Sequence, residues 1–130
     1  MPPSHPARVL IVDDEAQIRS VVRAILETAH RYEVDEVDDG ARALTRVEQW
    51  EPELVITDLV MPNQEGMGLI RKLRQSRPNL KIIAISGARG GAYLPVAKTM
   101  GANATLAKPF DPATLLAQVR QVLESTDRAA

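Results

Sequence analysis

Along this chain, short unbroken runs of apolar and β-branched residues alternate with longer segments whose apolar residues recur every three or four positions. An unbroken apolar run favours a parallel strand that is buried on both faces. Such runs occupy residues 9–12, 53–57, 81–86 and 104–107. A weaker run at residues 32–37, in which apolar and polar residues alternate imperfectly, suits an edge strand.

The segments between the runs carry the apolar stripes that are typical of amphipathic helices. A further helix is expected within residues 92–100, but it follows two glycines and contains Pro95, which is tolerated only in a first helical turn. We therefore expect this helix to begin late, near residues 93–95. The stripes predict the other helices over residues 16–29, 41–50, 67–76 and 112–124, the last with Asp111 as its cap and Pro112 at its start.

Strands and helices thus alternate along the whole chain, and this order predicts an α/β fold. We expect a doubly wound, five-stranded parallel sheet with helices on both faces. In such sheets ligands bind beyond the carboxyl ends of the strands, near the point where the strand order reverses. Residues at the ends of the runs are therefore the first candidates for a functional site.

Polar or ionisable residues stand at the ends of four of the apolar runs. Because the carboxyl ends of parallel strands meet at one edge of a sheet, we expect these side chains to converge. Simpler interpretations exist: the two aspartates after the first run could cap the next helix, and the others could be turn residues. The set consists of Asp13 and Asp14 after the first run, Asp58 after the third, Ser86 at the end of the fourth and Lys108 after the fifth.

Three clustered carboxylates raise one another's pKa unless a cation compensates them. Mg²⁺ is suited to this role because it prefers oxygen ligands. Lys108 offers a point charge and Ser86 a hydroxyl for phosphate oxygens, so the set matches what phosphoryl transfer requires. No His, Ser or Cys in the set has the base partner that a hydrolase nucleophile needs, which leaves a carboxylate as the nucleophile.

Four motifs in order, each at a strand end, give the chain a family resemblance. Over about residues 7–125 it resembles the response-regulator receiver domain of two-component signalling. The motifs are Val-Leu-Ile-Val-Asp-Asp-Glu at 9–15, Leu-Val-Ile-Thr-Asp-Leu-Val-Met-Pro at 54–62 with Gly66, Ile-Ile-Ala-Ile-Ser-Gly at 82–87, and Gly-Ala-Asn-Ala-Thr-Leu-Ala-Lys-Pro-Phe at 101–110.

The resemblance implies a flavodoxin-like (βα)5 fold with strand order 2-1-3-4-5. It implies that Asp58 accepts a phosphoryl group from a phosphohistidine in a reaction that depends on Mg²⁺ or Mn²⁺. It further implies that phosphorylation changes a protein-binding face. By the same resemblance, Asp14 and Asp58 would ligate the ion, Asp13 would hold it directly or through water, the Val60 backbone carbonyl would be a further ligand, Ser86 and Lys108 would bind phosphoryl oxygens, and the Lys108–Pro109 bond would be cis.

One position departs from the family pattern. Thr105 stands three residues before the lysine, where receivers commonly carry Tyr or Phe. In the family this aromatic ring rotates inward after phosphorylation and reports it to the adjacent surface. We hypothesise that this chain signals instead through the glycine-rich segment 87–91 and the helix after it. The expected output face comprises residues 92–104 and the last helix.

Composition excludes several classes of function. The net charge of −1 gives no argument for binding nucleic acid or an anionic membrane. The absence of cysteine excludes disulfides and thiolate metal sites. No apolar run approaches the roughly 20 residues of a membrane span, and the amino terminus has no apolar core of a signal peptide. We therefore expect a cytoplasmic protein.

Residues 1–7 hold three prolines and are predicted to be a disordered lead-in, residues 8–125 to form the receiver domain, and residues 126–130 to be a tail. The expected partners are a histidine kinase or histidine phosphotransfer protein and a downstream protein. Receivers also dimerise through their last helices, although no motif here requires it. No enzyme activity is expected beyond the domain's own phosphorylation and dephosphorylation.

Alternatives to a stand-alone regulator remain open. The chain could be an excised receiver from a hybrid kinase or another multidomain regulator, or a binding module that is not phosphorylated. An enzyme on the same fold is a further class. A flavin protein would need a phosphate-binding loop after the first strand, where Asp13, Asp14 and Glu15 would repel phosphate. A haloacid-dehalogenase-type phosphatase would need an Asp-x-Asp pair at that position.

Overall fold

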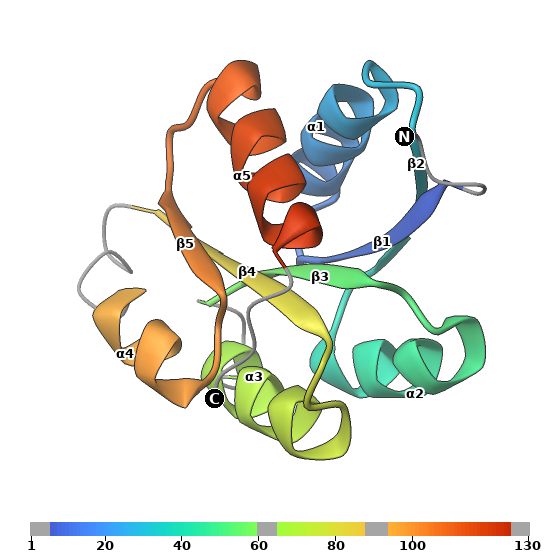
Figure 1. The fold of residues 1–130 in the computed structure, drawn as a ribbon. Coiled ribbons are helices and arrows are strands. Elements are labelled where there is room, and N and C mark those ends of the chain that lie inside the picture. Colours follow the sequence, from blue (N-terminus) through green and yellow to red (C-terminus); the bar gives the residue numbers. More distant parts are fainter. Residues whose placement is uncertain (1–5, 60–64, 88–93, 126–130) are drawn as a thin grey trace.

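The computed structural model describes residues 6–59, 65–87 and 94–125. Within these residues, strands and helices alternate in the predicted order (Figure 1). The strands are β1 (Ala7–Val12), β2 (Tyr32–Val37), β3 (Leu54–Asp58), β4 (Lys81–Ser86) and β5 (Ala104–Ala107). The helices are α1 (Ala16–Glu27), α2 (Gly40–Trp50), α3 (Glu65–Ser76), α4 (Leu94–Met100) and α5 (Pro112–Glu124).

The strands form one parallel sheet in the order β2-β1-β3-β4-β5. This confirms the predicted doubly wound, flavodoxin-like arrangement. The chain first places β2 on one side of β1, and then returns to place β3 on the other side. The strand order therefore reverses between β1 and β3, and a ligand site is expected at the carboxyl ends of these two strands.

Helices cover both faces of the sheet: α1 and α5 lie on one face, and α2, α3 and α4 lie on the other (Figure 1). A hydrophobic core lies on each face of the sheet, and alternate residues of β1 pack into the two cores. Leu10 and Val12 pack with α2, α3 and α4, whereas Val9 and Ile11 pack with α1 and α5. All four side chains are at most 1% exposed. Burial on both faces explains why the apolar run in the sequence is unbroken.

Strand β2 lies where the sequence predicted it, whereas strand β1 begins earlier than predicted. Strand β2 pairs only with β1, which confirms the predicted edge strand. Strand β1 begins at Ala7, before the apolar run, because the Ala7 amide donates to the carbonyl of Arg31 at 3.3 Å and Ala7 lies opposite Tyr32. Strand β1 therefore begins two residues before the predicted run of residues 9–12.

Helix α4 begins at Leu94, within the predicted range of residues 93–95, so that Pro95 lies in its first turn. In α5, Asp111 is the N-cap residue and its side chain accepts a hydrogen bond from the Thr114 amide at 2.7 Å, as the sequence predicted. The remaining helix bounds differ from the predicted ones by about two residues or less. In the described part of the chain, no helix has both the length and the apolar character needed to cross a bilayer.

The Arg74 side chain ties the end of α3 to the turn between α4 and β5. Its guanidinium donates to the carbonyl of Gly101 at 2.7 and 3.1 Å, to Oδ1 of Asn103 at 2.9 Å and to the carbonyl of Pro78 at 2.6 Å. Gly101 has a φ of 126°, a conformation that favours glycine. A Cβ atom at this position would lie 2.9 Å from Cγ of Arg74.

We expect the substitution Gly101→Ala to lower the free energy of unfolding by about 1–3 kcal/mol, because it strains the backbone and displaces Arg74. Urea denaturation would measure this change. Gly68→Ala is the matched control, since no described atom lies within 4 Å of a Cβ at Gly68. This helical substitution should stabilise the protein by about 0.5–1 kcal/mol. Equal stability of Gly101→Ala and the wild type would show that the turn does not require glycine.

Candidate functional site

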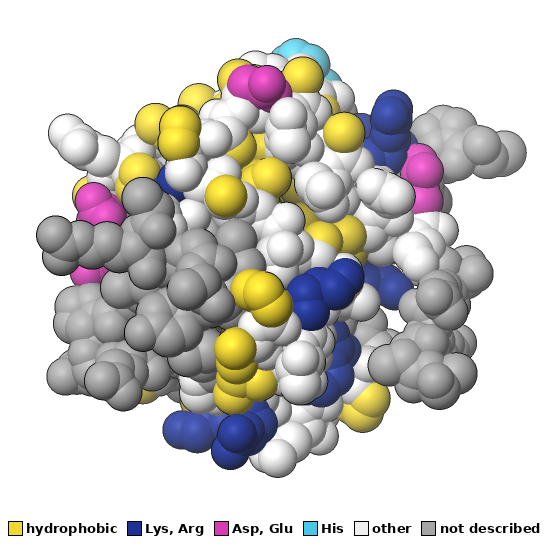
Figure 2. All heavy atoms as spheres, turned by 90° about the vertical axis from the view of Figure 1, so that its left-hand side faces the viewer, with side chains coloured by type: hydrophobic (Ala, Val, Ile, Leu, Met, Phe, Trp, Pro, Cys, Tyr) yellow, Lys and Arg dark blue, Asp and Glu magenta, His cyan; other side chains and the backbone are white. Residues whose placement is uncertain are grey.

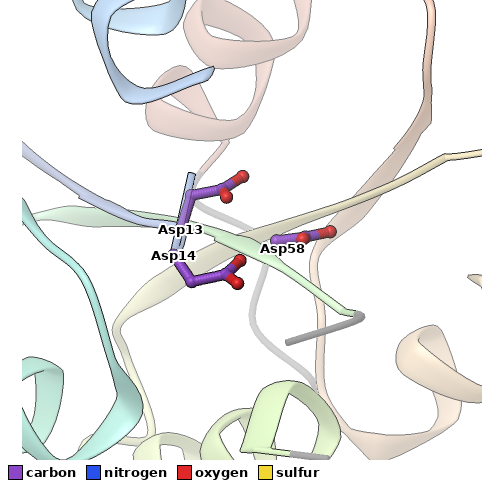
Figure 3. A group of neighbouring side chains, drawn as sticks. All are labelled: Asp13, Asp14 and Asp58. Atoms are coloured by element: carbon purple, nitrogen blue, oxygen red, sulfur yellow. The ribbon is translucent and has the colours of Figure 1, made fainter. Parts of the chain in front are cut away.

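The ends of β1 and β3 lie side by side at the carboxyl edge of the sheet. In the register of these strands Val12 lies opposite Thr57, so Asp13 and Asp58 are neighbours across the sheet. Asp14 follows on the turn into α1. The three side chains point to the same side, beyond the strand ends (Figure 3). The three carboxylates therefore converge where the strand order reverses.

The aspartates form a tight and partly buried cluster. Each offers a carboxylate oxygen, and these oxygens lie within 4.8 Å of one another. Asp13 is only 4% exposed and Asp58 only 5% exposed, whereas Asp14 is exposed to solvent. Negative charges held this close and away from water are unfavourable unless a cation joins them.

The pKa of Asp13 shows that ionisation is unfavourable in this cluster. Burial raises the pKa of its carboxyl from 3.8 to about 6, and the charges of Asp58 and Asp14 act in the same direction. The Glu15 amide, which donates to Oδ1 of Asp13 at 2.9 Å, and the charge of Lys108 oppose this pKa rise without cancelling it. A further positive charge would therefore stabilise the ionised form of the cluster.

Lys108 supplies part of that charge. Its Nζ atom lies 3.7 Å from Oδ2 of Asp13 and 3.8 Å from Oδ1 of Asp58. The Lys108 amide donates to the carbonyl of Ser86 at 2.7 Å, which fixes the end of β5 against the end of β4. The Lys108–Pro109 peptide bond is cis, as predicted. Lys108 thus sits between the two buried carboxylates.

Ser86 is the last residue of β4 and is fully buried. Its Oγ atom makes no hydrogen bond with any residue that the structure describes. A turn-forming serine would bond to nearby backbone, so the simpler interpretation of Ser86 is not supported. Leaving a buried hydroxyl unpaired costs about 1–3 kcal/mol, which makes this group a candidate for contacting a ligand.

The donor set fits a hard divalent cation such as Mg²⁺ or Mn²⁺, because every side-chain ligand offered is a carboxylate oxygen. Capping of α1 does not account for the aspartate pair. Glu15 is the N-cap residue of α1, and its side chain makes no capping hydrogen bond. Val60, whose carbonyl is a predicted further ligand, lies outside the described residues.

Two residues contact the site although the sequence did not single them out. Thr57 is fully buried, and its hydroxyl donates to the carbonyl of Asp58 at 3.1 Å. Arg19 on α1 donates from Nη1 to the carbonyl of Asp13 at 2.8 Å. The available signal for Arg19 is its spacing, since a residue one turn into a helix can reach back to the preceding strand end.

The side of the molecule that carries α4 and β5 has an uneven distribution of charge. Among the described side chains visible there, Lys and Arg lie in the centre, at the bottom and at the upper right of the view, while Asp and Glu appear toward its edges (Figure 2).

Comparison with known proteins gives a consistent result. Residues 9–120 match the family described as response regulator receiver domain. The chain is 36% identical over 135 residues to protein-glutamate methylesterase/protein-glutamine glutaminase 5 of Myxococcus xanthus, covering 95% of this chain and 39% of that protein. It is 31% identical over 121 residues to the response regulator MprA of a Mycobacterium species, covering 93% and 52%. The chain thus spans about half the length of such relatives, or less.

Solved structures agree with the sequence comparisons. A CheY-like response regulator receiver domain protein from Methanospirillum hungatei superposes with a TM-score of 0.84 at 30% identity, covering 92% of this chain and 94% of that chain. The receiver domain of NtrX from Brucella abortus gives a TM-score of 0.85 at 28% identity, covering 91% and 99%. The similarity therefore extends over nearly the whole fold of this chain.

Proposed function

We propose, because this chain belongs to the response regulator receiver domain family of two-component signalling, that Asp58 is its phosphorylated residue. The observation that carries the proposal is the environment of the Asp58 carboxylate. It is 5% exposed, it lies in a cluster of three carboxylates within 4.8 Å, and Lys108 Nζ is 3.8 Å away. This combination supports a nucleophile that works beside a cation and a fixed positive charge.

Asp13, Asp14 and Asp58 would hold Mg²⁺ or Mn²⁺, with the Val60 carbonyl as the further ligand that the family resemblance implies. When bound, the ion neutralises charge on the transferring phosphoryl group. The raised pKa of Asp13 supports this assignment, because a divalent cation would offset the cost of burying the charge and the repulsion from Asp58 and Asp14.

In the proposed reaction, a carboxylate oxygen of Asp58 attacks phosphorus and forms a new P–O bond. The bond from phosphorus to the donor breaks, and its electron pair leaves with the imidazole nitrogen of a phosphohistidine or with the acetate of acetyl phosphate. Lys108 pairs with one phosphoryl oxygen through Nζ. The Ser86 hydroxyl, which has no described partner, donates a hydrogen bond to another phosphoryl oxygen.

Members of this family interact with histidine kinases and with downstream targets. For this chain we propose a histidine kinase or histidine phosphotransfer protein as donor, a downstream protein as target and a cytoplasmic location. The proposal involves neither nucleic acid nor a membrane, and it confines the chemistry to the domain's own phosphorylation and dephosphorylation. The methylesterase named in the Myxococcus relative is an activity of that longer protein.

We propose a receiver domain over residues 8–125, which β1 extends by one residue to Ala7, with residues 126–130 as a tail. A stand-alone regulator and a receiver segment of a larger protein both fit this extent. Phosphorylation is proposed to alter the face formed by α4, β5 and α5, where Thr105 lines a groove of about 460 Å³ together with Lys98, Gln118 and Gln121. The alternative route through residues 87–91 stays a prediction, because residues 88–93 lie outside the described ones.

Incubation with acetyl phosphate and Mg²⁺ tests the proposed function. Intact-protein mass spectrometry should show one added phosphoryl group, and removal of Mg²⁺ by EDTA should abolish the shift because the carboxylate cluster then repels the phosphate. A wild-type protein that shows no shift at saturating Mg²⁺ would favour a receiver-fold binding module. Continuous release of phosphate over many turnovers would favour an enzyme.

A further inference from the structure

A network of charged side chains links β2 and α1 to the end of β1. Glu36 on β2 accepts hydrogen bonds from two arginines of α1. Its Oε1 accepts from Arg19 Nε at 2.8 Å, and its Oε2 accepts from Arg23 Nε at 2.7 Å. The two arginines differ in what else they bind. Arg23 donates to the carbonyl of Val34 at 3.2 Å, whereas Arg19 donates to the carbonyl of Asp13 at 2.8 Å.

This network holds the Arg19 guanidinium in one orientation. The Arg19 side chain is 18% exposed and that of Glu36 is 26% exposed. The guanidinium is a planar fork whose Nε and Nη1 atoms donate in fixed directions, so it can bridge two acceptors that a lysine could not reach together. The hydrogen bonds from Arg23 and Arg19 lower the pKa of the Glu36 carboxyl, which keeps it ionised at neutral pH.

The carbonyl that Arg19 binds belongs to the peptide between Asp13 and Asp14. A peptide unit is planar, so a fixed Asp13 oxygen also fixes the direction in which the chain enters Asp14. The same segment is held at two further points. The Asp13 amide donates to the carbonyl of Val37 at 3.3 Å, and the Glu15 amide donates to Oδ1 of Asp13 at 2.9 Å.

We propose that Arg19, oriented by Glu36, is a positioning residue that holds the Asp13–Asp14 peptide so that both carboxylates face Asp58 and a divalent cation. The inference rests on the proposed function, because that function assigns the cation to this cluster. Arg19 acts through the main chain. The cation that forms an ion pair with the Asp13 carboxylate is Lys108, at 3.7 Å.

Charge and positioning predict opposite results for the substitution Arg19→Gln. Loss of a cation near three carboxylates would, by charge alone, strengthen the binding of Mg²⁺. Loss of positioning weakens it, and outer residues that orient metal ligands typically contribute about 10–100-fold in metal affinity. We expect the dissociation constant for Mg²⁺, measured by calorimetric titration of the protein with MgCl₂, to rise about tenfold.

Arg23→Gln is the matched control. Like Arg19→Gln, it removes one positive charge from α1 and one hydrogen bond to Glu36. Unlike Arg19, however, Arg23 makes no described hydrogen bond to Asp13. Its dissociation constant for Mg²⁺ should change by less than about twofold, as expected for a partly exposed charge in salt. Arg19→Lys keeps the charge without the fork and should bind Mg²⁺ more weakly than the wild type. It also replaces Arg19→Gln in the test if thermal unfolding shows that Arg19→Gln does not fold.

The Mg²⁺ dependence of phosphorylation by acetyl phosphate provides the second measurement. Arg19→Gln should need about tenfold more Mg²⁺ for half-maximal rate, yet reach a maximal rate within about twofold of the wild type. Equal Mg²⁺ affinity of Arg19→Gln and Arg23→Gln, or tighter binding by Arg19→Gln, would overturn the inference alone. A wild-type protein that binds no Mg²⁺ would overturn the proposed function as well.

Discussion

Replacement of Asp58 by asparagine should abolish phosphorylation of this protein by acetyl phosphate. A carboxylate oxygen attacks phosphorus, whereas a neutral carboxamide is a far weaker nucleophile. Asparagine has nearly the volume of aspartate, so it can fill the same buried position at the end of β3. Intact-protein mass spectrometry, with Mg²⁺ in excess, would measure the loss of the phosphoryl adduct.

Asp38→Asn is the control for this experiment. Asp38 is an exposed residue whose carboxylate pairs with Arg42 at 3.4 Å, outside the acidic cluster. This variant should be phosphorylated to the wild-type extent. A full adduct on Asp58→Asn would contradict the proposal and move the acceptor to another residue.

The substitution Asp58→Asn should also stabilise the protein when EDTA removes divalent cations. The pKa of Asp13 in the folded protein is about 6, above its ordinary 3.8, so ionisation of Asp13 opposes folding. The ionisation of Asp13 therefore lowers the free energy of unfolding of the wild type as pH rises from about 4 through about 6. Burial is the main cause of this pKa shift and the Asp58 charge a smaller one, so the substitution reduces the decline without removing it, and we expect a gain of about 1 kcal/mol or less near neutral pH. Urea denaturation at several pH values would detect it, and parallel curves for both proteins would contradict it.

Replacement of Lys108 by alanine should slow phosphorylation of Asp58 by about 10²–10³-fold, which is the usual effect of removing one preorganised group that stabilises developing charge. Lys108 is the described cation that lies within 4 Å of both buried carboxylates, so it can pair with an oxygen of the incoming phosphoryl group. The rate of adduct formation at saturating Mg²⁺ would measure this effect. Circular dichroism would establish that the variant is folded.

Lys72→Ala is the control for the lysine experiment. Lys72 lies on α3 and is exposed. If general attraction of the anionic donor were the main effect, both lysine variants would lose rate to a similar degree. We expect Lys72→Ala to change the rate by less than about twofold, because exposed charges are screened by salt.

The sequence was sufficient to predict the sheet and most of the side chains at its carboxyl edge. Each strand was visible as a local run, and the residue after each run could be assigned to one edge because parallel strands share their direction. Asp13, Asp58 and Lys108 could therefore be grouped before any distance was known. The strand order followed from the family resemblance, since hydrophobic periodicity carries no information about which strands are neighbours.

Features that depend on contacts between distant segments could not be predicted. Arg19 is one of two arginines on α1, and the sequence does not show that β2 places Glu36 beside both of them. Trp50, the last residue of α2, packs against the core, and its ring also lies 5.6 Å from the Arg8 guanidinium and 5.3 Å from that of Arg46. Arg8 reaches the ring only because β1 begins before its apolar run, an extension that depends on backbone pairing with β2.

The pairing of Val12 with Thr57 limits how the length of this domain can vary in evolution. An insertion or deletion of one residue within residues 54–57 would turn Asp58 to the opposite face of the sheet, away from Asp13, because side chains alternate along a strand. Changes of length in the loops at the amino ends of the strands leave both the register and the side-chain directions intact. If Asp58 is the acceptor, as proposed, selection constrains the spacing of the strand as strictly as it constrains the aspartate itself.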